Sequence, residues 1–513
     1  MKNIIKQLSF IALVAVFFTS CEDAYEIDQV GRLEEENGFE SIGDLAQGLS
    51  GVYNRLDLTP NITFNANFTD EVSIGLDNGG QGLALYAFNL NAGSTASSNF
   101  WVRNYSVINA ANRVLRASDN IEFDQDDPAA LAEFNNILAH TRFIRAYAHF
   151  ELLTYYSPDM TDDNALSAII VDFVPDDIFQ VISVRNTNAE VYNFIEQDIQ
   201  FALDNITGNA LPNVNPIAAL SEEAIHAFRA RMYTYKEDYT TARDVLENDL
   251  GINAADAGAN LATALEYPDV FTDASNAGVI WKLERTIGDT YDAQGATGSV
   301  NAGGWAGASF AFINPTLDGS PYLEMDRKLF DELEEIGGVR IDVNVNPTSI
   351  IADDVSPSTP RSQDVIAINK YPGSEGQPLM NDLKVYRWAE MYLLLAEVEA
   401  SVDNFNEVAT ILNNIRTNRQ AVANVSVGNT EDAFAAILRE RRVELAFEGH
   451  RYVDIKRLGE KANVNIERGE SDCVPFGGVC TLESSDYRFN SLPIPIVEFN
   501  ANPDLRQQQN PGY

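Results

Sequence analysis

The stretch that most constrains this chain is residues 384–457, where three helix patterns follow one another. In each pattern, apolar residues recur at spacings of three and four, which lines one face of an α-helix. The first pattern carries this stripe at Tyr386, Met391, Leu394, Leu395 and Val398. The stretch therefore predicts three amphipathic helices that bury their apolar faces.

A row of acidic residues crosses the third of these helices. Glu440, Glu444 and Glu448 are four residues apart among arginines, so their side chains are neighbours on one helix face. Charged rows at this spacing usually face solvent, where each ion pair contributes little to stability. We therefore interpret the row as a solvated face, and Gly449 as the residue that stops the helix.

Two segments resemble helix hairpins of the tetratricopeptide type. Ala230, Tyr233 and Ala242 match three spaced positions of that repeat, in which small residues let two antiparallel helices approach closely. Residues 384–422 repeat the shape, with a turn at Asp403. Helix patterns in the N-terminal half, which support a helical scaffold, lie at 39–56, 100–117, 129–156, 188–206 and 221–249.

Two regions lack a helical period. Residues 59–97 are rich in Asn, Gly, Ser and Thr and are interpreted as a long loop. Between 251 and 383 the helix patterns largely stop, 279–285 alternate as in a strand, and 286–308 are rich in glycine. Recognition usually lies on loops that a rigid scaffold carries, so we expect a ligand to bind at these regions.

Residues 1–20 have the features of a secretory signal peptide. Two lysines precede an apolar run that ends at Phe18 and is too short to cross a bilayer of about 30 Å. Ser20 directly precedes a lone Cys21, as in a bacterial lipobox. This predicts lipidation of Cys21 and a tether over 21–38, although an ordinary signal with an incidental cysteine is the alternative.

If Cys21 is lipidated, Cys473 and Cys480 remain as an even pair in an oxidising compartment. Pro475 and Gly477 between them suit a tight loop. The pattern predicts a disulfide. Free thiols and a metal site are the alternatives, but the spacing fits no common zinc motif.

Composition limits the partners of this protein. The chain has 76 acidic and 35 basic residues, with a formal net charge of -41 at pH 7. Such a charge repels nucleic acid and anionic lipid, and it favours a neutral or cationic ligand. After the N-terminal segment, no apolar stretch has the length of a membrane-spanning helix.

Several segments resemble the SusD/RagB family of outer-membrane nutrient-binding lipoproteins: VYRWAEMYLLLAEVEA, ILNNIRTNRQA, LRERRVELAFEGHRYVDIKRLG and SLPIPIVEFNANPDLRQQQNPGY. The resemblance implies a mainly α fold, in which tetratricopeptide-like helix hairpins form a scaffold for a loop-rich ligand-binding region with minor β structure. It implies one SusD-like unit over 39–513. The parts of that unit would be a scaffold at 39–250 and 384–460, an insertion at 251–383 and a C-terminal segment at 461–513.

The resemblance also implies a function and a partner. The protein would be a lipid-anchored protein of the outer membrane at the cell surface, and Glu22 and Asp23 resemble the export tag of such lipoproteins. It would bind an oligosaccharide or polysaccharide and deliver it to a TonB-dependent outer-membrane β-barrel transporter (SusC-like), without catalysis. A peptide-binding member of the family and a surface glycoside hydrolase are the rival interpretations, the second disfavoured because no common catalytic motif is present.

Aromatic residues beside the two loop regions are the candidate ligand contacts. A flat ring can stack on a sugar, and a nearby amide can hydrogen-bond its hydroxyls. The family places its ligand in these regions, which selects Trp101, Asn104, Tyr291, Trp305 and Tyr322. A core position on its helix is the alternative for Trp101.

No cofactor is expected from the sequence. Asp70, Glu71 and Asp77 could bind a hard cation such as calcium through their oxygens. Their spacing fits no EF-hand, so a structural calcium ion stays an open alternative. The four histidines lie in or at the ends of helices and are interpreted as packing residues.

Overall fold

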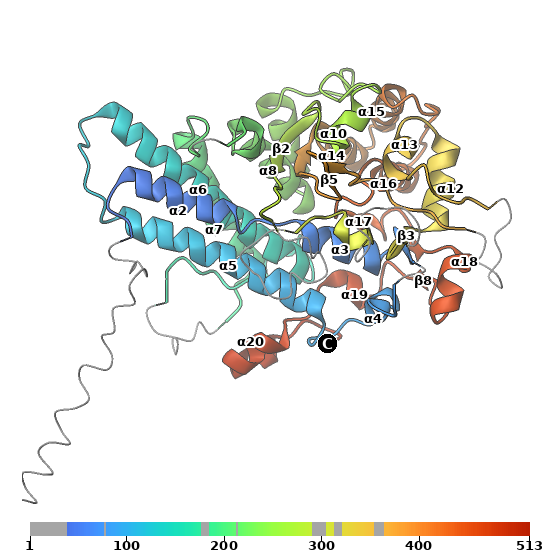
Figure 1. Cartoon of the computed structure of the whole chain (residues 1–513), viewed down its shortest axis with the longest axis horizontal. Helices are drawn as coiled ribbons and strands as arrows, with labels where there is room; N and C mark the ends of the chain where they lie inside the picture. The colour runs from blue at the N-terminus through green and yellow to red at the C-terminus, as the bar shows by residue number, and fades with distance from the viewer. Residues whose placement is uncertain are drawn as a thin grey trace, which may run out of the picture.

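We analysed a computed structural model, which describes residues 38–75, 78–175, 184–211, 214–289, 304–311, 321–352 and 364–513. The chain is mainly α-helical, with short antiparallel strand pairs (Figure 1). This confirms the predicted fold class. The expectations for the signal peptide, the tether, Cys21, Asp77 and Tyr291 concern residues outside the described ranges.

Helices α2 (Ile42–Tyr53), α5 (Thr95–Ser118), α6 (Pro128–Tyr156) and α7 (Asn188–Asn205) run side by side at the left of Figure 1. Their ends follow from capping chemistry. Ser41 and Thr187 begin α2 and α7 with capping boxes, in which side chains satisfy the free N–H groups of the first turn. At the other end of α6, Ser157 adopts an extended backbone before Pro158.

Two helix hairpins confirm the tetratricopeptide-like pattern. Helix α8 (Glu222–Tyr235) packs on α9 (Tyr239–Asp244), which continues as a π-helical turn, and α14 (Trp388–Ser401) packs on α15 (Phe405–Asn418). Ala230 and Ala242 are fully buried between helices. Asp403 has a φ of 59°, the left-handed conformation that the predicted turn requires.

The interpretation of 59–97 as a long loop is wrong in part. This stretch contains α3 (Thr59–Phe68), β1 (Val72–Ile74) and α4 (Leu83–Tyr86). Helix α3 is buried on most sides, polar residues included, so it carries no apolar stripe that a periodicity argument could detect.

Strand β2 (Val279–Leu283) confirms the strand predicted at 279–285. It pairs antiparallel with β6 (Leu383–Arg387), so Tyr386 lies in a strand and not on a helix face as predicted. The other pairs are β1 with β3 (Leu323–Met325), β4 (Gly373–Ser374) with β5 (Gln377–Pro378), and β7 (Ile466–Glu467) with β8 (Thr481–Leu482).

Shorter helices complete the described region. They are α10 (Tyr267–Phe271), α11 (Ala308–Ala311), α12 (Arg327–Ile336), α13 (Arg340–Asn344), α16 (Thr430–Glu444), α17 (Arg451–Leu458), α18 (Glu470–Cys473), α19 (Tyr487–Asn490) and α20 (Ile496–Ala501), with 3-10 turns at Pro216–Ala218, Val474–Phe476 and Pro503–Gln508. One hydrophobic core joins the helical parts to the C-terminal segment, and includes Leu45, Leu395 and Leu492. Cys473 and Cys480 form a disulfide with their Cα atoms 5.2 Å apart.

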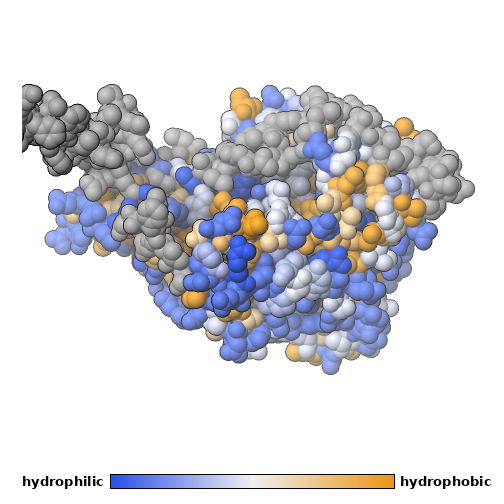
Figure 2. Space-filling model, turned by 90° about the horizontal axis from the view of Figure 1, so that it is seen from below, coloured by the Kyte–Doolittle hydropathy of each residue, from blue (hydrophilic) through white to orange (hydrophobic). Residues whose placement is uncertain are grey.

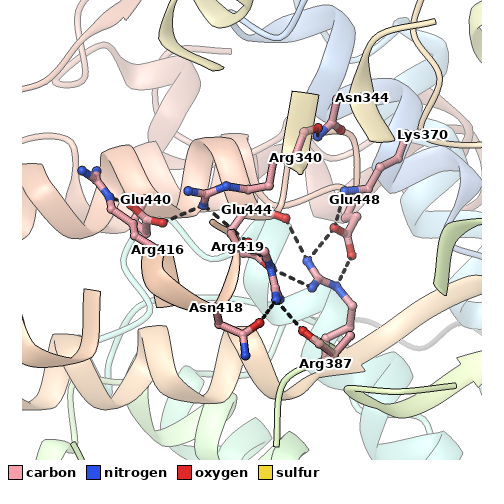
Figure 3. Close-up of polar contacts among 11 residues, drawn as sticks. Arg340, Asn344, Lys370, Arg387, Arg416, Asn418, Arg419, Glu440, Glu444 and Glu448 are labelled. Atoms are coloured by element: carbon pink, nitrogen blue, oxygen red, sulfur yellow. Dashed lines mark hydrogen bonds and ion pairs between the residues drawn. The ribbon is translucent and has the colours of Figure 1, made fainter. Parts of the chain in front are cut away.

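The acidic row of α16 is not a solvated face, which corrects the prediction. Glu440, Glu444 and Glu448 are buried in a network of cationic side chains (Figure 3). Arg340 and Arg416 each lie 2.6 Å from Glu440. Helical spacing shows which side chains are neighbours, but it does not show that other segments cover them.

The same network controls the titration of Glu448. Burial raises the pKa of this carboxyl, but Arg387 and Lys370 outweigh that effect and lower the pKa to about 2. The group therefore stays ionised inside the folded protein.

No helix of the described residues is long and apolar enough to span a membrane. One face of the molecule is shown in Figure 2, where hydrophilic residues predominate and apolar residues gather in patches.

Candidate ligand-binding site

Trp101 is a core residue, which corrects its selection as a stacking platform. Its side chain is only 2% exposed. The ring lies against Tyr105 and Tyr156, and Nε1 donates a hydrogen bond of 2.8 Å to Glu498. Glu498 of α20 therefore holds the N–H edge of the indole, while Tyr105 and Tyr156 lie against the ring that we expected a sugar to use.

Trp305 and Tyr322 are buried as well, with exposed fractions of 8% and 7%. The indole of Trp305 packs with Ala308 and Met380 and donates to the carbonyl oxygen of Thr286 at 3.1 Å. A ring must present a face to stack on a sugar. The expectation that Trp305 is an exposed stacking platform is therefore wrong, and the ring of Tyr322, selected as a ligand contact, is buried too.

Asn104 is the predicted residue that the structure places at a cavity. It lies on α5 and lines a cavity of about 20 Å³ with Asn61, Arg103 and Glu151. Its Nδ2 donates to the carbonyl oxygen of Phe100 one turn earlier, at 2.8 Å.

Asp57 organises this cavity from one side. Its buried carboxylate lies 3.0 Å from Arg103 of α5 and 3.0 Å from Arg285, which follows β2. It also accepts a hydrogen bond of 2.9 Å from the backbone N–H of Thr59 at the start of α3. Three segments distant in sequence are thus fixed together at one carboxylate.

Hydrogen bonds from Thr59 and Arg285 also hold the glycine-rich region beside the cavity. The carbonyl oxygen of Gly304 accepts hydrogen bonds from Thr59 Oγ1 at 2.9 Å and from Arg285 Nε at 3.1 Å. The backbone next to Trp305 is therefore anchored beside the segment that lines the Asn104 cavity. The structure brings the two predicted loop regions together, but through residues that we did not predict.

A second cavity of about 30 Å³ continues the first, because Leu58, Asn61, Tyr147 and Glu151 line both. Burial raises the pKa of Glu151, and the hydrogen bond of 2.8 Å from Asn61 Nδ2 opposes this shift. Each of the two cavities has room for about one or two waters. Because they are continuous, we call them together the Asn104 cavity.

The charged groups at the far end of this cavity are compensated. Arg231 forms a bidentate pair with Glu390, at 2.7 and 2.6 Å. Burial lowers the pKa of His450 to about 4, so the ring is neutral near pH 7. Amide, hydroxyl and carboxyl groups therefore lie beside apolar side chains such as Val107 and Val453 in the lining, and the polar groups suit the hydroxyls of a neutral polar molecule.

The ionisable side chains that line the two cavities include the carboxyl groups of Asp57, Glu151 and Glu448. Among the described residues at the two cavities there is no serine or cysteine to act as a nucleophile. Glu151 is the residue that sequence reasoning missed and could have found, because it interrupts an otherwise apolar and aromatic run near the end of α6.

Two of the three proposed calcium ligands, Asp70 and Glu71, are engaged by the protein itself. Asp70 is held by Arg451 through two hydrogen bonds of 2.8 and 2.9 Å. Glu71 accepts from the backbone N–H of Phe447 at 2.8 Å. Within the described ranges no group of three or more such side chains is arranged to hold a metal ion.

The fold is a helical, tetratricopeptide-like scaffold, and residues of α3, α5 and α6 help to line two small, continuous cavities. The chain belongs to the SusD/RagB family. A model described as the SusD family matches residues 346–513, and a model described as starch-binding associating with outer membrane matches residues 35–234.

Two relatives from Formosa agariphila match nearly the whole chain. SusD-like protein P2 is 24% identical and covers 99% of both chains, and SusD-like protein P38 is 21% identical over 90% of this chain and 93% of that one.

Solved structures show the same fold. A putative sugar binding protein from Bacteroides vulgatus has a TM-score of 0.70 at 22% identity, covering 93% of this chain and 99% of its own. A laminarin binding SusD-like protein has a TM-score of 0.64 at 19% identity, covering 93% of this chain and 100% of its own.

Proposed function

We propose that this protein is a lipid-anchored protein of the outer-membrane surface that binds a glycan at the face of the molecule that carries the Asn104 cavity, which has room for single hydroxyl groups and not for a sugar ring. It passes the glycan to a TonB-dependent β-barrel transporter without altering it and without a cofactor. The observation that carries the proposal is the cavity lined by Asn61, Asn104 and Glu151. Beside it, Asp57 links Arg103 of α5 to Arg285, and Arg285 donates a hydrogen bond to the carbonyl oxygen of Gly304.

The ligand class follows from the chemistry of this cavity. Asn61, Asn104 and the carboxyl group of Glu151 offer hydrogen bonds to hydroxyls, while the strongly negative net charge of the chain disfavours an anionic ligand. Two relatives in structure are described as sugar binding and laminarin binding. The hydrogen-bonding groups of the lining and these structural relatives support an oligosaccharide, and the net charge of the chain favours a neutral one.

The anchor and the partner rest on other observations. One family model is described as associating with outer membrane. The N-terminal sequence carries a charged start, an apolar run and Ser20-Cys21, which supports lipidation. A transporter partner is supported by the family alone.

The test is a calorimetric titration of the mature protein with a panel of neutral oligosaccharides. Asn104→Ala should weaken binding about 10-fold, because it removes a hydrogen-bonding amide from the cavity. The control is Asn248→Ala, which removes an exposed amide on another helix.

Each result has a defined meaning. Equal affinity of both variants and the wild type would move the ligand away from the Asn104 cavity. Binding of peptides, with no binding across the glycan panel, would favour the peptide-binding alternative. Release of shorter sugars during the titration would favour the hydrolase.

A further inference from the structure

A second hollow lies over helix α6, between α5 and α7, away from the Asn104 cavity. Helix α6 packs along both neighbours, as the left part of Figure 1 shows. The hollow has a volume of about 720 Å³, and it shares no lining residue with the Asn104 cavity. Small-molecule sites commonly have volumes of about 300–1,000 Å³, so this hollow has the size of a binding site.

The charges that line this hollow differ from those of the whole chain. Three arginines and three aspartates face it: Arg116, Arg142, Arg145, Asp119, Asp172 and Asp198. The whole sequence, by contrast, has 35 basic against 76 acidic residues. The hollow is therefore a place where a strongly acidic protein can accept an anionic group.

One of these arginines, Arg145, is paired with side chains of the protein itself. Arg145 donates two hydrogen bonds to Asp198, at 2.8 and 2.7 Å, and one to Asn112 Oδ1, at 2.9 Å. All three residues are buried. They form a neutral, rigid floor, because a bidentate pair fixes the planes of both groups.

Arg142 lies one helical turn before Arg145 and has no such carboxylate partner among the described residues. Its guanidinium is half-buried and lies over the ring of Phe201, with Cζ 4.1 Å from the ring centroid. Its Nε is shielded from solvent and has no hydrogen-bond partner, and within the described ranges no carboxylate pairs with it. Because Nε is shielded, the two terminal nitrogens of Arg142 are the donors that remain for an acceptor in the hollow that this residue lines.

We propose that Arg142 and this hollow bind the acidic group of a sugar, either the carboxylate of a uronic acid or a sulfate ester. The planar guanidinium matches such oxyanions with two parallel hydrogen bonds, and the Phe201 ring holds it in place. Phe134 and Phe194 are half-buried at the same hollow and offer apolar surface to the sugar ring. The sugar part of this inference rests on the proposed function, whereas the acidic group rests on Arg142.

The experiment titrates the full mature chain with glucuronate and galactose 6-sulfate, and with glucose and galactose as neutral counterparts. Arg142→Gln should weaken the binding of both acidic sugars about 10-fold or more, because it removes a charge-assisted bidentate contact. Arg506→Gln is the matched control, since Arg506 also lies over a ring, that of Phe499 at 5.4 Å, but on the surface elsewhere. It should bind as the wild type does.

Two further variants show whether a loss of affinity comes from a folding defect or from the loss of positive charge alone. Gln197→Glu adds a negative charge at an exposed position of the lining and should weaken acidic sugars while circular dichroism stays unchanged. Arg142→Lys should recover only part of the affinity, because an ammonium lacks the planar fork.

Several outcomes would overturn the proposal. These are unchanged binding by Arg142→Gln, full recovery by lysine, equal binding of the neutral sugars, or inorganic sulfate binding as tightly as galactose 6-sulfate. Neutral oligosaccharide binding that depends on Asn104 but not on Arg142 would leave the proposed function intact in every one of these cases, so the two failures can be told apart.

Discussion

Removing the charge of Glu444 should destabilise the protein more than almost any surface change. Glu444 is buried in α16 and accepts hydrogen bonds from Arg387 at 3.0 Å and from Arg419 at 2.9 and 3.1 Å. Arg340 lies 3.4 Å away. Glu444→Gln keeps the shape but leaves three buried guanidinium groups without this anion.

The magnitude follows from the cost of an uncompensated buried charge. Breaking a buried ion pair by removing one partner typically costs about 3–5 kcal/mol. We expect a loss of that size in the free energy of unfolding at pH 7, measured by urea denaturation with circular dichroism. Glu335→Gln is the matched control, because Glu335 pairs with Arg439 at 2.8 Å but is 71% exposed. Its loss should stay below about 1 kcal/mol.

The pH dependence gives a second readout. Burial raises the pKa of Glu444, but Arg419, Arg387 and Arg340 together lower it far below its usual range. A carboxyl with a lowered pKa stabilises the fold above its unfolded pKa of about 4.5, and this stability is lost as the pH falls toward the folded pKa. The difference between wild type and Glu444→Gln should therefore narrow below pH 4.5. Equal stability of the Glu444 and Glu335 variants at pH 7 would refute the reasoning.

Other changes have expected outcomes of different kinds. Cys21→Ala should release the protein from the outer-membrane fraction, and retention of an unacylated protein there would contradict lipidation. Mass spectrometry of an unreduced digest should show Cys473 linked to Cys480; replacing both with serine should cost less than the about 3 kcal/mol expected for a 15-residue loop, since this loop is shorter. Trp305→Ala should lower the free energy of unfolding by about 3–5 kcal/mol, because the ring is buried; lost glycan affinity at full stability would instead restore the ring as a ligand contact.

Helices with one apolar face could be predicted from the sequence, and those without one could not. The stripe at Val408, Ile411, Leu412 and Ile415 is buried as expected in α15. Helix α3 escaped detection because Asn65 is fully buried and bonded at both ends of its amide, to Tyr155 and Tyr452. Polar residues that are satisfied inside a core look like loop residues in a one-dimensional pattern.

The candidate site could be predicted only in part, because its contacts join residues that are far apart in the sequence. Asn104 could be selected because it lies beside a loop-rich region, but Asp57 could not, since its partner Arg285 is 228 residues away in the sequence. Trp101 and Trp305 were misjudged for a related reason. A large ring beside glycine and asparagine looks exposed in the sequence, whereas distant segments such as that of Glu498 cover it in the fold.

The buried arginines also bear on how so acidic a chain could accept the two proposed ligands, a neutral glycan and an acidic sugar. Glu397, Glu440 and Glu444 are each held by two or more arginines, so these interior carboxylates add little to the net charge of -41. The excess negative charge is then carried largely by exposed groups, which salt screens over about 10 Å at 0.1 M. A neutral glycan meets no repulsion at the Asn104 cavity. An acidic sugar can be accepted only where the lining is balanced and a guanidinium has no carboxylate of its own, and Arg142 meets both conditions.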